Sequence, residues 1–389
     1  MTRARSSAAP GARRGSAGAA LAAALVMAAG LVAGCGSSPQ RPAPRPLAPL
    51  GAAKVDVRPA WNQQIGPVQF PLVVAVNGNV ATVAASDGSV HAIDADSGRA
   101  LWRANVGAKL GAGVGSDGRS AAVVTQTGEL VVLENGSVKW RRAVGARVAT
   151  PPLVAGERVF VLAVDRSVHA FDGSDGHKLW SVQRPGDPLN LLQAGVLLAV
   201  KDTLVVGQGP RLAGLDPSNG GVRWEAPIGS PRGANEVERL ADLVGPVVRA
   251  GDVVCARSFQ AAVGCVDADR GVTAWARNVG GTDAVGGDAT LLFGADASDR
   301  MTAWRLPTGD VAWTSESLLY RGVGAPAAIG GSVVYGDEQG TLHWLARDNG
   351  EAQQRLATDG SPIQVRPAVV GSTLIVVTRN GGVYAFRSP

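Results

Sequence analysis

Residues 168–180 read Val-His-Ala-Phe-Asp-Gly-Ser-Asp-Gly-His-Lys-Leu-Trp, and the order of an apolar run, Asp172, Gly176 and Trp180 decides the fold. The same order recurs along the chain about every 40 residues, which indicates a repeat architecture. In each unit the Asp position ends one apolar run, the Gly belongs to a turn, and the Trp lies in the next run. The Asp position is held in turn by Asp94, Glu134, Asp172, Asp216, Asp267, Arg305, Ala346 and Arg387.

This repeat predicts an all-β fold, an eight-bladed β-propeller of four-stranded antiparallel blades. The chain from Trp61 to Pro389 divides into eight units of about 41 residues, the length of one blade. Glycine, at 52 residues, supplies turns between apolar runs, and long amphipathic helical patterns are missing. The last unit ends before its Trp, so we expect Pro59–Gln63 to pair with Gly382–Phe386 and close the ring, which removes free sheet edges.

The unit that contains Trp180 predicts strands at 152–154, 158–163, 168–172 and 178–182. Asp165 and Arg166 would turn the second strand into the third. Gly176 would help turn the third strand into the fourth, because glycine accepts positive φ. We expect the Trp to cover the junction between blades, with its indole N–H donating to a carbonyl.

The N-terminus indicates an exported lipoprotein. Arginines precede an apolar run over 17–33, and the run ends in Leu31-Val32-Ala33-Gly34-Cys35, a lipobox-like sequence. We interpret 1–34 as a signal peptide, Cys35 as the lipidated first mature residue, 35–60 as a flexible proline-rich tether and 61–389 as the propeller. A membrane span is the alternative interpretation, although about 17 apolar residues are at the short limit for spanning.

Charge and the residues after Cys35 bear on location and partners. Removing 1–34 takes away four arginines and no acidic residue, so the net charge falls from +5 to +1. No basic face remains to favour nucleic-acid binding. Gly36 and Ser37 lack the Asp that retains many lipoproteins in the inner membrane. We therefore expect a lipid-anchored protein on the periplasmic face of the outer membrane.

Cys255 and Cys265 flank a predicted hairpin and would lie nearly opposite one another on adjacent strands. Export permits a disulfide there. Two small buried residues are the alternative, because Cys265 occupies a position that alanine fills in other units. The sequence leaves both open, since strand register is uncertain by one residue and disulfide geometry is demanding.

Catalytic signatures are missing from the sequence. No nucleophile elbow, Cys–His pair or phosphate-binding loop occurs. His91, His169 and His343 occupy the same third-strand position in three units, so they are not expected to converge on a metal ion, and His177 lies in a surface turn. Asp94–Gly98 resembles part of a calcium loop but carries Arg99 where that loop needs glycine. We expect no enzymatic activity, no cofactor and no metal.

The repeat is similar to the pyrroloquinoline-quinone-type propeller repeat over residues 61–389. Two groups share it, quinoprotein dehydrogenases and the BamB family of outer membrane assembly lipoproteins. The dehydrogenases are much longer and carry an adjacent cysteine pair that this chain lacks. Asn235-Glu-Val-Glu-Arg-Leu-Ala-Asp-Leu243, followed by Pro246, resembles the signature loop of the BamB family.

Repeat spacing points to the same region. The steps from Asp172 to Asp216 and from Asp216 to Asp267 are 44 and 51 residues, against 38 to 41 elsewhere. The extra residues lie near 184–193 and 227–243, both between an outer strand and the next inner strand. Loops of one kind emerge on one face, so two adjacent blades should build a local projection.

The resemblance implies that these two loops bind a periplasmic POTRA domain of BamA. Leu189, Leu191 and Asp242 match the family pattern, whereas Leu192 replaces an Arg and Val244 replaces a second acid. On the residues alone, Leu191 and Leu192 would equally well begin the next strand, and Glu236 and Arg239 would form a local ion pair. The candidate partner-binding residues are Leu189, Leu191, Leu192, Glu236, Glu238, Arg239 and Asp242.

The function hypothesis is a non-catalytic scaffold of the outer membrane β-barrel assembly (BAM) complex. It would hold BamA while barrel proteins are folded and inserted, and direct handling of unfolded β-barrel precursors is a weaker extension. The alternative is a quinone- or ligand-binding propeller, an enzyme or sensor anchored in the periplasm.

Overall fold

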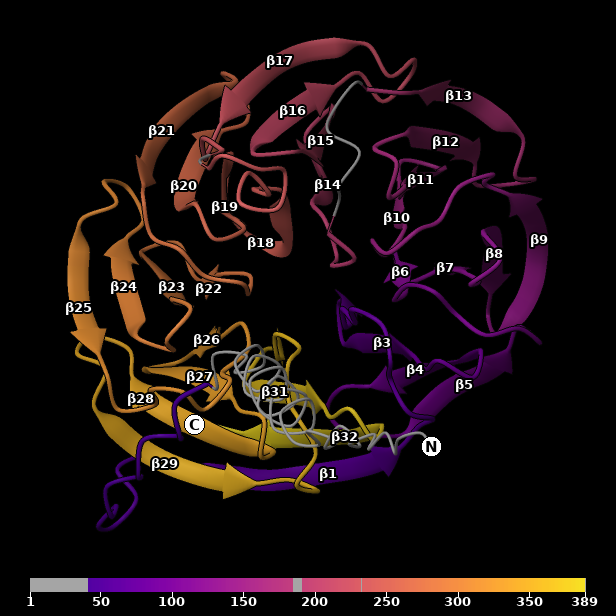
Figure 1. Ribbon diagram of the computed structural model, residues 1–389. Coiled ribbons are helices and arrows are strands. Elements are labelled where there is room, and N and C mark those ends of the chain that lie inside the picture. Colours follow the sequence, from indigo (N-terminus) through magenta and orange to yellow (C-terminus); the bar gives the residue numbers. More distant parts are fainter. Residues whose placement is uncertain (1–40, 185–190, 232, 389) are drawn as a thin grey trace, which may run out of the picture. The chain divides into compact units, whose positions relative to one another are not determined.

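The computed structural model describes residues 41–184, 191–231 and 233–388. Residues Ala43–Pro389 form one compact unit, a ring of eight four-stranded antiparallel sheets (Figure 1). Within the described ranges, no helix is long and apolar enough to cross a membrane. The predicted signal peptide and Cys35 lie outside the described residues.

The first four blades follow one another along the chain, each from its innermost to its outermost strand. Blade 1 contains β2 (Ala75–Asn77), β3 (Val80–Ala84), β4 (Ser89–Asp94) and β5 (Ala100–Asn105). Blade 2 contains β6 (Gly115–Ser116), β7 (Ser120–Val124), β8 (Glu129–Glu134) and β9 (Ser137–Ala143). Blade 3 contains β10 (Leu153–Ala155), β11 (Arg158–Leu162), β12 (Val168–Asp172) and β13 (Lys178–Val182). Blade 4 contains β14 (Leu197–Val200), β15 (Thr203–Gln208), β16 (Arg211–Leu215) and β17 (Val222–Pro227).

The last four blades complete the ring. Blade 5 contains β18 (Leu243–Ala250), β19 (Val253–Ser258), β20 (Ala262–Asp267) and β21 (Val272–Arg277). Blade 6 contains β22 (Gly286–Gly287), β23 (Leu291–Ala295), β24 (Met301–Arg305) and β25 (Val311–Ser315). Blade 7 contains β26 (Ala327–Ile329), β27 (Ser332–Gly336), β28 (Thr341–Ala346) and β29 (Ala352–Ala357). Blade 8 contains β30 (Ala368–Val370), β31 (Thr373–Val377), β32 (Gly382–Arg387) and β1 (Arg58–Gln64).

Ring closure occurs in blade 8, where the first strand of the chain pairs with the last. The antiparallel register runs from Arg58↔Arg387 to Gln64↔Gly382, with an irregularity between Pro59 and Trp61. Figure 1 shows the indigo β1 beside the yellow β32. The predicted architecture and closure are confirmed, and blade 3 has its four strands within one residue of the predicted bounds.

Tryptophans join five pairs of neighbouring blades by one recurring hydrogen bond. Trp275 in blade 5 donates from Nε1 to the carbonyl of Leu306 in blade 6, at 2.7 Å. Its ring covers Gly309, where φ is +70° and an added Cβ would lie 2.5 Å from the ring. Only glycine therefore both adopts this positive φ and leaves room for the indole ring of Trp275. In four other pairs of blades a Trp Nε1 donates in the same way to the carbonyl of the residue that follows the Asp position of the next blade. These bonds join Trp61 to Ala95, Trp140 to Gly173, Trp180 to Pro217 and Trp313 to Arg347.

Residues 45–57, which we call the strap, run against blades 6 and 7. Arg45 N–H donates to Leu319 O at 2.9 Å, and Lys54 N–H donates to Gln353 O at 3.1 Å. Leu47 packs on the apolar cluster of blades 6 and 7, and Val57 is buried in the cluster of blades 7 and 8. The sequence indicated a free tether through residue 60. The structure instead places this part of it on the ring, because isolated apolar residues between the prolines find apolar partners there.

Cys255 in β19 and Cys265 in β20 are direct partners in the antiparallel register. Their Cα atoms are 4.0 Å apart, and the structure joins their sulfur atoms. Both side chains are fully buried in the cluster between blades 5 and 6. Opposite positions on neighbouring strands therefore supply the proximity that the sequence left open.

We expect the double variant Cys255→Ala/Cys265→Ala to be less stable than the oxidised wild type by about 2–3 kcal/mol, the loop-closure value for a loop of about ten residues. Urea unfolding monitored by tryptophan fluorescence measures this difference. Wild type unfolded with a reductant is the matched control and should resemble the double variant. Free thiols titrating in the denatured, unreduced protein would contradict the pairing.

Candidate functional site

The two longest connections between blades lie next to each other on one face. One runs from the end of β13 to the start of β14, and the other from the end of β17 to the start of β18. Both lead from an outer strand to the inner strand of the next blade, as the repeat spacing predicted. Leu189 lies outside the described residues. The other candidate residues are described, and the structure gives them different roles.

Asp242 holds the two loops together. Its Oδ1 accepts a hydrogen bond from Arg166 Nη2 at 3.1 Å, and its Oδ2 accepts from the backbone N–H of Leu191 at 3.2 Å. The side chains of Arg166 and Asp242 are only 15% and 18% exposed. Asp242, the last residue of the second loop, thus joins a turn of blade 3 to the C-terminal half of the first loop and acts as a positioning residue.

The two leucines of the first loop face different ways. Leu191 is half-buried and packs against the apolar cluster of Val244, Ala284 and Ala325 beside the ring axis. Leu192 is 52% exposed. Neither belongs to a strand, because β14 begins only at Leu197. The alternative that both leucines begin the next inner strand is therefore wrong, and Leu192 is the one that a partner can reach.

The second loop contains a single tight turn. Asn235 Oδ1 accepts the N–H of Glu238 at 2.9 Å, and Glu238 Oε2 accepts the N–H of Ala234 at 2.8 Å. This reciprocal arrangement resembles a capping box, in which each side chain satisfies a backbone donor. Glu238 therefore braces its own loop. Glu236 and Arg239 are exposed and form no ion pair with each other in the described structure, so the local ion pair weighed from the sequence is missing.

Together the loops present a mixed surface, which we call the patch: Leu192, Glu236, Val237 and Arg239. Val237 is 72% exposed, the highest value among the described large apolar side chains that are exposed. A cavity of about 280 Å³ separates the second loop from blade 4 and carries an ion pair between Arg184 and Glu225. Exposed apolar side chains beside charged ones are typical of protein-binding surfaces with an apolar centre and polar rim.

Sequence reasoning missed two of these residues. Arg166 has φ of +67°, in a turn where blades 1, 2, 7 and 8 carry the glycines Gly88, Gly128, Gly340 and Gly381. Blades 5 and 6 also carry non-glycine residues with positive φ at this turn, Gln260 and Asp299, so the conformation of Arg166 alone does not identify a functional side chain. Val237 was part of the recognised loop and was not chosen. The sequence pattern that could have identified Val237 is an aliphatic residue between two glutamates in a turn.

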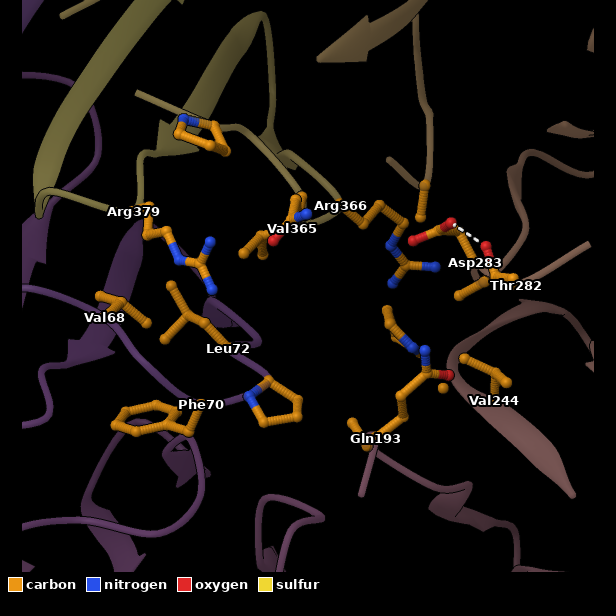
Figure 2. Close-up of a pocket in the computed structure, with 18 of the residues that line it drawn as sticks. Val68, Phe70, Leu72, Gln193, Val244, Thr282, Asp283, Val365, Arg366 and Arg379 are labelled. Carbon is orange, nitrogen blue, oxygen red and sulfur yellow. Dashed lines mark hydrogen bonds between the residues drawn. The ribbon is translucent and has the colours of Figure 1, made fainter. Parts of the chain in front are cut away.

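A second hollow lies at the mouth of the central channel. It measures about 320 Å³ and is lined by residues that precede or begin inner strands, among them Leu72, Gln193, Val244 and Arg366. Figure 2 shows the guanidinium groups of Arg366 and Arg379 directed into it. Val244, where the family carries a second acid, is buried and faces this channel side rather than the patch.

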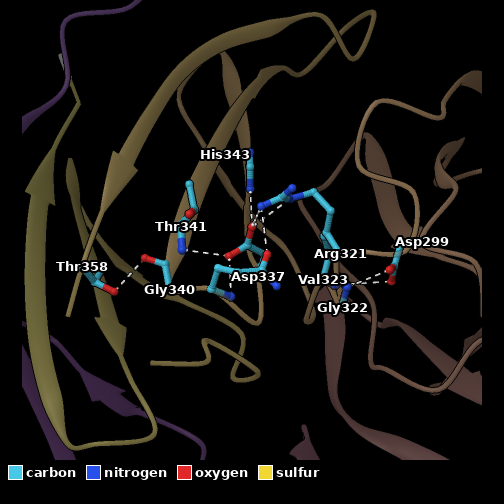
Figure 3. Close-up of polar contacts among 10 residues, drawn as sticks. Asp299, Arg321, Gly322, Val323, Asp337, Gly340, Thr341, His343 and Thr358 are labelled. Atoms are coloured by element: carbon cyan, nitrogen blue, oxygen red, sulfur yellow. Dashed lines mark hydrogen bonds and ion pairs between the residues drawn. The ribbon is translucent and has the colours of Figure 1, made fainter. Parts of the chain in front are cut away.

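Three histidines occupy equivalent buried positions on third strands, as predicted. Figure 3 shows the most buried of them, His343, whose Nε2 lies 2.9 Å from Asp337 Oδ2. Asp337 also accepts bonds from Arg321 and from the backbone N–H of Thr341, so the cluster secures the turn between β27 and β28. His169 lies 2.8 Å from Ser167 Oγ in the same manner. Among the described residues, no three His, Cys, Asp or Glu side chains form a group that could hold a metal ion.

These histidines predict that acid weakens the fold. Burial lowers the pKa of His91, His169 and His343, and for His343 it outweighs the raising effect of Asp337. A folded-state pKa below the unfolded value of about 6.5 gives stability that is complete above that pH and is lost as the pH falls through it. We expect the urea midpoint to fall between about pH 7.5 and about pH 5.5. The variant His169→Asn should show a smaller fall, and an equal fall would contradict the assignment.

Comparison with known proteins gives one consistent family. A family model described as "Outer membrane protein assembly factor BamB" matches residues 86–315. The protein of that name from Burkholderia pseudomallei is 36% identical over 360 residues, covering 91% of this chain and 94% of that protein. The Bordetella pertussis protein of the same name is 33% identical, covering 87% of this chain and 88% of that protein.

Solved structures agree on the fold. The crystal structure of BamB from Moraxella catarrhalis superposes with a TM-score of 0.76 at 21% identity, covering 85% of this chain and 100% of that one. The quinohemoprotein alcohol dehydrogenase from Comamonas testosteroni superposes with a TM-score of 0.63 at 15% identity, covering 86% of this chain and 77% of that one. At these identities the likeness shows a shared propeller and no more.

Proposed function

Because the chain belongs to the BamB family of outer membrane protein assembly factors, we propose that it is a non-catalytic scaffold of the BAM complex. In this proposal the patch binds a periplasmic POTRA domain of BamA and so supports the folding and insertion of outer membrane β-barrel proteins. Family membership supports the assembly role. The structure of the two loops supports the choice of surface.

The observation that carries the proposal is the construction of the patch. Two neighbouring loops, the longest in the ring, are tied by Asp242 to each other and to blade 3. On this fixed base Leu192 and Val237 are exposed and Glu236 and Arg239 flank them. A preorganised apolar pair with charges around it favours binding, since little conformational entropy is lost when a partner docks.

Membrane attachment is the second part of the proposal. Cys35 would carry the lipid that holds the mature chain on the periplasmic face of the outer membrane, and the support for it is the lipobox-like sequence before Cys35. Two or more acyl chains give stable anchoring, whereas one gives only marginal binding. Metabolic labelling with palmitate should label the wild type and leave Cys35→Ser unlabelled.

Co-isolation tests the scaffold function. The full chain with a C-terminal affinity tag is extracted from its native outer membrane in mild detergent, and BamA is measured in the eluate by immunoblot. A lipid-anchored tagged protein unrelated to the BAM complex is the control. We expect BamA with the full chain and not with the control, together with fewer outer membrane β-barrel proteins in cells that lack the gene. Equal BamA in both eluates and unchanged barrel levels would contradict the function.

A further inference from the structure

The lining of the channel mouth contains two arginines and one aspartate. Two arginines of blade 8 enter it, Arg366 from just before β30 and Arg379 from the turn between β31 and β32 (Figure 2). Arg366 uses Nη1 to donate to Val247 O in blade 5 at 2.8 Å. No other hydrogen bond or ion pair joins the Arg366 or Arg379 side chain to a described residue.

Arg366 lines two cavities of the channel. A second cavity, of about 420 Å³, shares Leu72, Pro246, Val365 and Arg366 with the first. The bond from Arg366 to Val247 spans from blade 8 to blade 5 between the two cavities. The half-buried guanidinium of Arg366 thus lies between the two cavities. Its remaining N–H groups are available as donors to the cavity of about 320 Å³.

Burial of this guanidinium is not offset by a carboxylate. Burial lowers the pKa of Arg366 to about 10, and no neighbouring acid raises it again. Asp283 lines the same cavity and accepts a hydrogen bond from Thr282 Oγ1 at 2.7 Å. Its charge acts on the fully buried Arg257, whose pKa it raises, although burial lowers that pKa by more. A partly buried positive charge without a neighbouring carboxylate favours binding of an anion.

The remaining walls indicate which anion. Val68, Phe70, Leu72, Val244 and Val365 supply apolar surface around the arginines. Guanidinium groups match carboxylates through paired hydrogen bonds. Gln193 also lines the cavity, and its Oε1 accepts no hydrogen bond within the described structure.

We propose that the channel mouth is a binding site for a small organic anion, a single carboxylate on a short apolar stem. The carboxylate lies between Arg366 and Arg379, and the stem packs on Phe70, Leu72 and Val244. The volume of about 320 Å³ is at the lower end of the range for ligand sites, about 300–1,000 Å³, which fits a small ligand. This site is separate from the patch and does not depend on the scaffold function.

Calorimetric titration of the full chain with sodium octanoate tests the site, with octanamide as the uncharged control and inorganic phosphate as the anion without a stem. We expect saturable octanoate binding that weakens with added salt, and no binding of octanamide or phosphate. Arg379→Gln should weaken octanoate about tenfold or more, since a charged hydrogen bond is lost. Arg379 is exposed and its side chain makes no hydrogen bond to a described residue, so this variant should fold normally.

Two further variants sharpen the outcome. Arg366→Gln should also lose octanoate, and its unfolding curve shows whether the lost bond to Val247 disturbs the ring. Arg158→Gln, an arginine of blade 3 outside the channel lining, should bind like wild type. Octanoate that does not bind, or that binds no more tightly than octanamide, overturns the proposal. Unchanged affinity in Arg379→Gln does the same.

Discussion

Removing β1 is expected to abolish the cooperative fold, although the strand is only seven residues long. β1 is the outer strand of blade 8, and Trp61 donates to Ala95 O in blade 1 at 2.9 Å. Its loss leaves β32 as a free edge and separates blade 8 from blade 1. In a closed ring each blade is stabilised by its contacts with both neighbours. We expect the free energy lost at one broken contact to exceed the net stability of a folded protein, which is only about 5–15 kcal/mol.

Three N-terminal truncations separate this effect from that of the strap. A chain that begins at Ala43 keeps the strap, one that begins at Arg58 keeps β1 alone, and one that begins at Ile65 has neither. We expect the first to unfold like the full chain and the second at a somewhat lower urea concentration, because the contacts of Arg45 and Leu47 are lost. The third should show no cooperative transition in circular dichroism. If the chain that begins at Ile65 unfolded cooperatively, at the same urea concentration as the chain that begins at Arg58, ring closure by β1 would not be needed for the fold.

Asp242→Arg is expected to disorganise the patch and to prevent recovery of BamA. The substitution removes the acceptor of both Arg166 and the Leu191 N–H and places two positive charges together. Breaking a buried pair by losing one partner costs about 3–5 kcal/mol, and we expect roughly 2–4 kcal/mol here because the pair retains some exposure. Urea unfolding and the BamA immunoblot measure the two effects.

A charge exchange and a surface pair serve as controls for this variant. Arg166→Asp added to Asp242→Arg restores opposite charges but not the bond to Leu191, so stability should return in part. Asp252→Arg disrupts an exposed pair with Lys201 and should change stability by less than about 1 kcal/mol and leave BamA bound. If Asp242→Arg behaved like Asp252→Arg, Asp242 would not be a positioning residue.

The fold was predictable because its determinants are local. The Asp, Gly and Trp of one unit specify a turn and a covering indole, and eight copies leave few alternatives to a ring. The strap was not predictable in the same way. Its contacts join residues 45–57 to residues about 300 positions away, and a proline-rich composition by itself indicates an extended linker.

The position of the two long loops was predictable, but the roles of their side chains were not. Unequal repeat lengths located the two loops, whereas side-chain direction inside an irregular loop follows no period. Leu191 was therefore chosen as an anchor although it packs inward, and Val237 was overlooked although it is the more exposed. Asn235 and Glu238 are separated by three residues, a capping pattern that would have assigned Glu238 to its own loop.

The most direct test of the central claim is recovery of BamA by the patch variant Leu192→Asp/Val237→Asp beside a matched control. The control, Val272→Asp/Val311→Asp, alters two valines that are 48% and 56% exposed on the outer strands of blades 5 and 6. We predict equal melting of the three proteins, BamA with wild type and with the control, and none with the patch variant. BamA recovered equally by all three would contradict the patch, and BamA absent from wild type would contradict the scaffold function itself.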